Sequence, residues 1–125
     1  MARILIAEDE ESVRALVTRA LTQDGHTVVA TADGAEALDV LAREDGAFDL
    51  LLADIKMPVM DGIALALAAA RDYRTLPIVL MSGYSDQRER TSSLDALIRD
   101  VIAKPFTLAE LRFAIASALA QGKKR

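Results

Sequence analysis

The chain has 125 residues, and its 19 acidic and 15 basic side chains give a net charge of −4. This length predicts one domain with its own hydrophobic core, and the lack of cysteine excludes disulfides, thiolate metal sites and cysteine nucleophiles and fits a cytoplasmic location. The acidic balance and the 4% aromatic content disfavour a nucleic-acid partner, and no apolar stretch approaches the roughly 20 residues of a membrane span.

Short apolar runs alternate with longer amphipathic segments along the chain. The runs have the length and composition of buried strands, and the other segments have the apolar spacing of helices. Strands are predicted at Arg3–Ala7, Thr27–Thr31, Phe48–Ala53, Pro77–Met81 and Ile98–Ala103. Helices are predicted at Glu11–Gln23, from Asp33 to near Gly46, at Ile63–Arg71, at Ser85–Leu97 and from Thr107 onward.

The helix starts carry recognisable signals. Asp33 is followed three residues later by Glu36, and Thr107 by Glu110, so both pairs predict capping boxes. The last helix is expected to bury Leu108, Leu111, Ala114, Ile115 and Leu119. Phe113 is expected in the core, with a surface position as the alternative.

Strict alternation of strands and helices predicts an α/β fold with a parallel sheet covered by helices on both faces. In such sheets ligands bind at the carboxyl ends of the strands. The sequence places its most reactive polar residues at those ends, each directly after an apolar run: Glu8 and Asp9, Asp54, Ser82, and Lys104.

These residue types suit phosphoryl chemistry. Three carboxylates without histidine or thiolate form an all-oxygen site that favours Mg²⁺, with Mn²⁺ as a substitute. Asp54 is the candidate nucleophile, because a carboxylate can attack phosphorus to form an acyl phosphate. The Ser82 hydroxyl and the Lys104 ammonium can each bind one oxygen of the transferred group. Taken alone, Glu8 and Asp9 would equally suit the acidic start of a helix.

The pattern resembles the receiver domains of two-component response regulators over essentially the whole chain. The segment Asp54–Gly62 is similar to that family's phosphorylation loop, Glu8-Asp9 to its acidic pair, and Lys104-Pro105-Phe106 to its lysine-proline motif. All of these motifs occur in the family's order, on the expected strand ends.

The resemblance implies a flavodoxin-like (βα)5 fold, a doubly wound parallel sheet with strand order 2-1-3-4-5. It implies a receiver domain at residues 1–121 followed by a basic tail at 122–125, and a cis peptide bond before Pro105. The domain would be a phospho-accepting signalling domain and not an enzyme. Asp54 would take its phosphoryl group from a histidine kinase or a histidine phosphotransfer protein. Mg²⁺ would be held by Asp9, Asp54 and the Lys56 backbone carbonyl, with direct or water-mediated support from Glu8.

The chain departs from the family's pattern at a residue of the conformational switch that responds to phosphorylation. Many receivers carry Tyr or Phe three residues before the lysine, where this chain has Val101. We therefore expect that movement of Ser82 reaches the protein surface by a route that does not use an aromatic side chain at position 101. Tyr84 follows Ser82 by two residues and is therefore expected near the mouth of the pocket. We expect Tyr84 and Lys56 to shield the acyl phosphate from water.

The output of the switch has three candidates within the family. No further module follows the last predicted helix, so a stand-alone receiver that acts through protein contact is expected. Ala7–Glu10 and Met81–Tyr84 most resemble the CpdR-type receivers, which are adaptors for an energy-dependent protease. A phosphorelay shuttle and a motor- or kinase-control receiver are the alternatives.

An enzyme of a different class is a remote alternative. A magnesium-dependent phosphatase of the haloacid dehalogenase type also uses an aspartyl nucleophile. Such an enzyme needs a second Asp two residues later, where this chain has Lys56, and its nucleophile normally follows the first strand and not the third.

Overall fold

The structure, a computed structural model, describes residues 1–83, 94 and 96–121. Its centre is one sheet of five parallel strands in the order β2-β1-β3-β4-β5, which confirms the predicted topology. The strands are β1 (Arg3–Ala7), β2 (Thr27–Thr31), β3 (Leu50–Asp54), β4 (Ile78–Ser82) and β5 (Asp100–Ala103).

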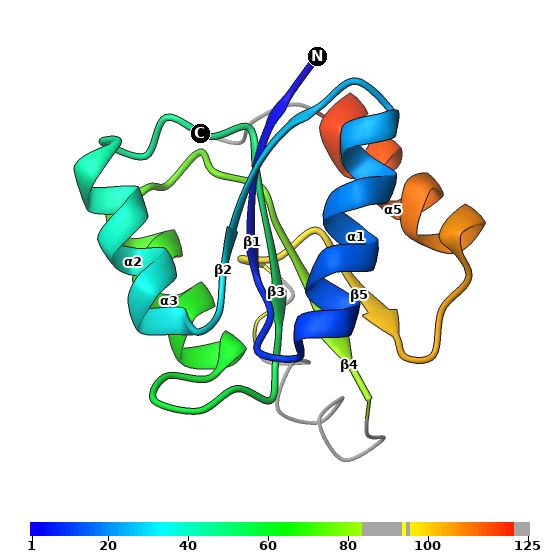
Figure 1. Cartoon of the computed structure of the whole chain (residues 1–125). Helices are drawn as coiled ribbons and strands as arrows, with labels where there is room; N and C mark the ends of the chain where they lie inside the picture. The colour runs from blue at the N-terminus through cyan, green and yellow to red at the C-terminus, as the bar shows by residue number, and fades with distance from the viewer. Residues whose placement is uncertain (84–93, 95, 122–125) are drawn as a thin grey trace.

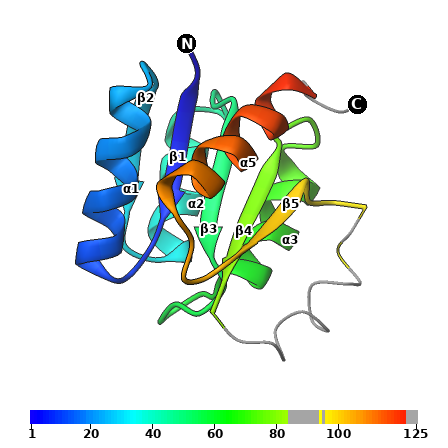
Figure 2. The same ribbon diagram turned by 90° about the vertical axis from the view of Figure 1, so that its right-hand side faces the viewer.

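Helices cover both faces of the sheet, as Figures 1 and 2 show. They are α1 (Glu11–Gln23), α2 (Gly34–Arg43), α3 (Gly62–Asp72) and α5 (Leu108–Ala120). Helices α1 and α5 lie on one face, and α2 and α3 lie on the other. The helix predicted at Ser85–Leu97 falls largely outside the described residues, as does the basic tail at 122–125. Every helix in the described part is too short or too polar to span a lipid bilayer.

The alternation of side chains along the strands divides the core in two. In β1, Ile4 and Ile6 pack with α1 and α5, whereas Leu5 and Ala7 pack with α2 and α3. All five residues of β3 are buried, as expected for a central strand covered on both faces. This rigid centre fixes the position of the residues at its carboxyl edge.

Two predicted strand boundaries were wrong. We expected Phe48–Ala53, but β3 starts at Leu50, because the Asp49 side chain accepts the Arg3 N–H at 2.8 Å beside the sheet. At the other end, Asp54 belongs to the strand and pairs with Met81 of β4.

The fourth and fifth strands also differ from their predicted ranges. Strand β4 runs from Ile78 to Ser82, one residue later at each end than predicted, because Ser82 pairs with Ala103. Strand β5 starts at Asp100 and not at Ile98, since the Ile98 N–H donates to the Leu94 carbonyl in a preceding turn.

The capping predictions were largely confirmed. Thr107 and Glu110 form a complete capping box at the start of α5. Asp33 caps α2 by accepting the Glu36 N–H at 2.9 Å, but Glu36 returns its side chain to Ala32 and not to Asp33. The box at α2 is therefore wider by one residue than its sequence pattern predicts.

The prediction for Phe113 was wrong. Its side chain is 76% exposed, while the neighbouring Leu111, Ala114 and Ile115 are buried. At 3.6 residues per turn, position 113 points away from the face that 111, 114 and 115 share. The predicted core residues Leu108 and Leu119 are only partly buried, at the margin of that face.

Candidate functional site

The predicted polar residues meet at the carboxyl edge of the sheet. Asp54 and Ser82 are the last residues of β3 and β4, Glu8 and Asp9 directly follow β1, and Lys104 directly follows β5. Because the strands are parallel and adjacent, their carboxyl ends lie along one edge. Residues far apart in the chain thereby become neighbours.

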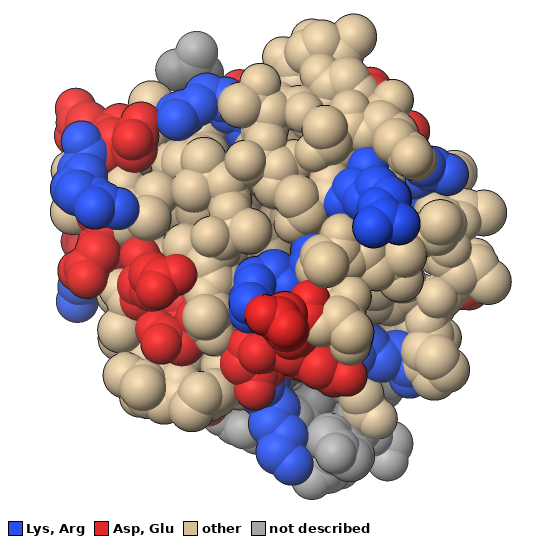
Figure 3. All heavy atoms as spheres, viewed as in Figure 1, with Lys and Arg blue, Asp and Glu red and all other residues tan. Residues whose placement is uncertain are grey.

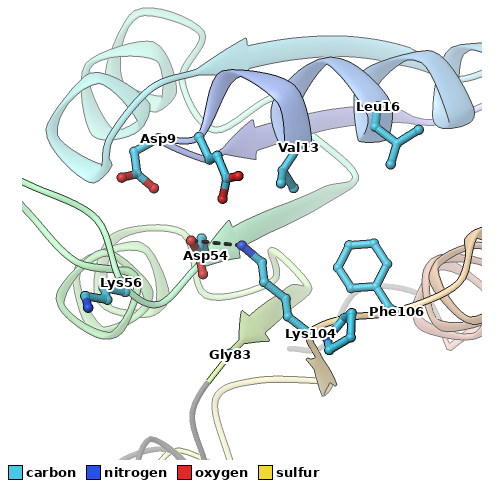
Figure 4. Close-up of a pocket in the computed structure, with 10 residues that line it drawn as sticks. Asp9, Val13, Leu16, Asp54, Lys56, Gly83, Lys104 and Phe106 are labelled. Atoms are coloured by element: carbon cyan, nitrogen blue, oxygen red, sulfur yellow. Dashed lines mark hydrogen bonds and ion pairs between the residues drawn. The ribbon is translucent and has the colours of Figure 1, made fainter.

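Lys104 bridges two of the carboxylates. Its Nζ lies 2.8 Å from Glu8 Oε1 and 3.1 Å from Asp54 Oδ2. In Figure 4 the Lys104 side chain extends along the pocket toward Asp54, the residue it pairs with across the sheet edge. Glu8 is fully buried and Asp54 nearly so, which makes these pairs stronger than surface ion pairs.

The three carboxylates are arranged as a cation site. Glu8, Asp9 and Asp54 each offer an oxygen, and these oxygens lie within 4.8 Å of one another. Asp9 is exposed, so the group is open to solvent on one side. A charged, oxygen-only donor set with room for water is what Mg²⁺ prefers. Lys56, whose carbonyl was the fourth predicted ligand, lines the same pocket.

Burial and charge act against each other in this group. Burial raises the pKa of Glu8 above its usual range, although hydrogen bonds from Lys104 and the Glu10 N–H oppose the shift. Burial by itself lowers the pKa of Lys104, but its hydrogen bond to Glu8 and the charges of Asp54 and Glu8 together outweigh it. The pKa of Lys104 therefore lies above its ordinary value, and the ammonium stays charged.

Backbone contacts hold the acidic pair in place. The Glu8 N–H donates to the Thr31 carbonyl at 3.0 Å, and the Glu10 N–H donates to Glu8 Oε2 at 3.0 Å. The Arg14 guanidinium donates to the Glu8 carbonyl at 2.8 Å. Sequence reasoning did not single out Arg14. The available signal was a basic residue in the first turn of the helix that follows the acidic pair.

A cavity of about 680 Å³ opens over Asp54. One part of its wall is polar, and the other is apolar, with Val13 and Leu16 of α1 facing Phe106 (Figure 4). Pro105, joined to Lys104 by the expected cis peptide bond, continues the apolar side. Val13 and Leu16 were not predicted at the site, because nothing in a local pattern brings α1 near the segment after β5.

Acidic side chains gather around the entrance. Figure 3 shows a red cluster where α1 begins, with basic groups beside it. Asp9, Glu10 and Glu11 are all exposed at this helix start. The site therefore attracts cations before any ligand binds.

The remaining predicted residues have distinct positions. Ser82 is buried, and its carbonyl accepts the Lys104 N–H at 2.8 Å, which ties β4 to the lysine segment. Val101 is partly buried and packs on the core at the α2 and α3 face. Tyr84 lies outside the described residues.

Comparison with known proteins identifies the family. Residues 4–116 match the response regulator receiver domain. The chain belongs to this family. Receiver domains are phosphoacceptors of two-component signalling and not conventional enzymes, they partner with histidine kinases or phosphotransfer proteins, and they bind Mg²⁺ at an acidic site of the kind described above.

Individual relatives extend this result. The transcriptional regulatory protein TcrA of Mycobacterium tuberculosis is 37% identical over 109 residues, which cover 87% of this receiver chain and 42% of TcrA. This chain thus spans less than half the length of that relative.

Solved receiver structures share the fold. The response regulator TrrA of Thermotoga maritima, in complex with Mg²⁺-BeF, is 29% identical with a TM-score of 0.83, covering 94% of this chain and 99% of TrrA. The non-phosphorylated HemR receiver domain of Leptospira biflexa is 25% identical with a TM-score of 0.88, covering 100% and 99% of the two chains.

Proposed function

We propose that this receiver accepts a phosphoryl group on Asp54 from a histidine kinase or a histidine phosphotransfer protein, and that phosphorylation changes its binding to other proteins. The observation that carries the proposal is the geometry around Asp54. One of its oxygens pairs with Lys104, it lies within reach of two further carboxylates, and it faces an open cavity. This arrangement supplies an acceptor, a fixed cation and a site for a divalent metal together.

In the proposed reaction an Asp54 carboxylate oxygen attacks phosphorus. The bond from phosphorus to the donor imidazole nitrogen breaks, and the electron pair leaves with the imidazole. Asp9, Asp54 and the Lys56 carbonyl would hold Mg²⁺, with Glu8 in support and Mn²⁺ as a substitute metal. When bound, the metal neutralises negative charge that develops on the phosphoryl oxygens.

Lys104 and Ser82 have complementary parts in this proposal. The Lys104 ammonium already donates a hydrogen bond to Asp54. It can therefore exchange this carboxylate oxygen for a phosphoryl oxygen with little movement. The Ser82 hydroxyl, from the neighbouring strand end, would bind another phosphoryl oxygen. The new contacts would draw Ser82 and Lys104 toward Asp54 and so change the protein surface around the site.

For the output we propose an adaptor role in regulated proteolysis. The support is the likeness of Ala7–Glu10 and Met81–Tyr84 to adaptor receivers. A pull-down from cell extract with wild type and Asp54→Ala, each with and without phosphodonor, tests this role. Capture of an energy-dependent protease that changes with phosphodonor for wild type but not for Asp54→Ala supports it. Capture of a kinase or phosphotransfer protein alone points to a relay shuttle.

Phosphoryl acceptance is tested directly with acetyl phosphate and Mg²⁺. Intact-mass spectrometry should show one added phosphoryl group on wild type, removed by hydroxylamine, because hydroxylamine cleaves acyl phosphates. Asp54→Ala should take up none, and Asp49→Ala, directly before the opposite end of the same strand, should behave as wild type. Equal uptake by Asp54→Ala, or sustained turnover of phosphate esters, would contradict the proposal.

A further inference from the structure

The loop at residues 55–61 leaves the end of β3 and returns to it. The Gly62 N–H, at the start of α3, donates to the Ile55 carbonyl at 2.8 Å. Gly62 lies so close to the strand that a β-carbon there would overlap the Asp54 carbonyl oxygen. The two ends of the loop are therefore fixed to the strand that carries Asp54, and Lys56 lies within it.

The middle of this loop is a strained turn. The Met60 N–H donates to the Pro58 carbonyl at 2.7 Å, and Val59 between them has a φ of 67°. This is the γ-turn with a left-handed central residue, the rarer and more strained form, and a β-branched residue adopts it at a cost. The Val59 side chain is 84% exposed, so its own packing offsets little of that cost.

The first residue of α2 contacts the loop at this turn. The Gly34 N–H donates to the Met60 carbonyl at 3.2 Å, and Gly34 is buried. A β-carbon on Gly34 would lie 2.6 Å from the Met60 carbonyl oxygen and 2.9 Å from Met60 Cγ. Because the nearer obstacle is backbone, it cannot move aside as a side chain would. Only glycine permits this approach.

The hydrogen bond from Gly34 to Met60 stabilises the loop at residues 55–61 more than it stabilises α2. Asp33 already caps α2 through the Glu36 N–H, so the helix has a side-chain cap of its own. The Met60 carbonyl, by contrast, is directed at the positive end of α2 and fixed there by Gly34. The strained turn is thus held from outside the loop.

We propose that Gly34 is a positioning residue of the cation site. Its contact with Met60 holds the strained turn in place. The position of this turn then fixes the Lys56 carbonyl beside Asp9 and Asp54. This inference rests on the proposed function, in which that carbonyl is a metal ligand. Gly34 itself touches neither the metal nor the phosphoryl group, and it acts through the loop.

The first test is the Mg²⁺ affinity of Gly34→Ala, measured by calorimetry on the full chain. We expect a dissociation constant roughly tenfold weaker than wild type, the scale typical when the support of a metal ligand is removed. Far-ultraviolet circular dichroism should remain that of the wild type. A Gly34→Ala protein that is folded and binds Mg²⁺ as tightly as wild type overturns the proposal.

Ala35→Gly is the matched control. It makes the reverse exchange one residue further along α2, where it weakens the helix without altering the Gly34 contact. Its Mg²⁺ affinity should equal that of wild type. If Ala35→Gly weakens Mg²⁺ binding as much as Gly34→Ala does, general destabilisation explains the effect and the proposal fails.

A second measurement on wild type does not depend on any variant folding. In amide NMR spectra, saturation with Mg²⁺ should shift the Gly34 resonance and slow its hydrogen exchange, because the Met60 carbonyl becomes more firmly fixed. The amide of Gly46, beyond the far end of α2, should be unaffected. A Gly34 amide that does not respond to Mg²⁺ overturns the inference. Phosphoryl uptake is separate: wild type that binds Mg²⁺ in this way but accepts no phosphoryl group would contradict only the proposed function.

Discussion

Glu8 is a fully buried carboxylate with both oxygens engaged. Oε1 accepts from Lys104 at 2.8 Å, and Oε2 accepts from the Glu10 N–H at 3.0 Å. Burial nevertheless dominates and raises the pKa of Glu8, so the ionised form is less favourable in the folded protein than in the unfolded chain. Without metal, the charge on Glu8 therefore reduces the stability of the fold.

This imbalance predicts a pH dependence for Glu8→Gln. A raised folded-state pKa contributes stability that is fully present below the unfolded value, near 4.5, and is lost as pH rises through the folded pKa. Glutamine resembles the protonated acid at every pH. Without Mg²⁺, Glu8→Gln should thus gain stability relative to wild type as pH rises above 4.5, as measured by urea unfolding at several pH values. A difference that does not change with pH, or that changes in the opposite direction, would contradict the expected sign.

At the scale of elements, the start of α5 is fixed by its capping box. The Thr107 hydroxyl accepts the Glu110 N–H at 3.0 Å, and the Glu110 side chain accepts the Thr107 N–H at 2.8 Å. This box lies three residues after Lys104, so it also ends the segment that carries the lysine and Phe106 into the pocket. The helix start therefore stabilises both the fold and one wall of the site.

Thr107→Ala should lower the free energy of unfolding by about 1 kcal/mol, because one N–H at the helix start loses its acceptor. Ser117→Ala is the control, an exposed position on the same helix where alanine removes no cap. Chemical denaturation of both variants provides the measurement. Equal effects of the two substitutions would show that the Thr107 hydroxyl adds nothing to the stability of the fold.

At the scale of the whole molecule, the cation site is assembled from separate strand ends. Glu8 and Asp9 come from the end of β1 and Asp54 from β3, so the unfolded chain does not hold the three carboxylates together. A ligand that binds only the folded state stabilises that state by mass action. Binding of Mg²⁺ at the proposed site would therefore be coupled to folding.

Mg²⁺ at a hundred times its dissociation constant should add about 2.7 kcal/mol to the free energy of unfolding. Thermal unfolding with Mg²⁺, and again after removal of the metal with a chelator, measures the effect. Asp9→Asn should bind Mg²⁺ more weakly and show a smaller gain at the same concentration. A melting temperature that does not respond to Mg²⁺ in wild type would contradict the proposed cation site.

Local sequence determined the elements and the residues available to the site. The spacing of apolar residues that predicts a strand or a helix depends only on a short segment of sequence. The observed ranges of β1, β2 and α1 therefore agree with the predicted ones. The alternation of elements requires a parallel sheet, and a parallel sheet places Asp54, Ser82 and Lys104 at one edge. The capping box of α5 could be predicted for the same reason, since it depends on residues three apart.

The tertiary structure alone decided what depends on distant segments. It placed Lys104 between Glu8 and Asp54, brought Val13 and Leu16 opposite Phe106, and joined Gly34 to Met60. It also left Phe113 exposed, because α5 packs on the sheet through the face that carries Leu111, Ala114 and Ile115. Local periodicity carries no information about which side chains of separate elements meet, because those contacts form only when the layers pack together.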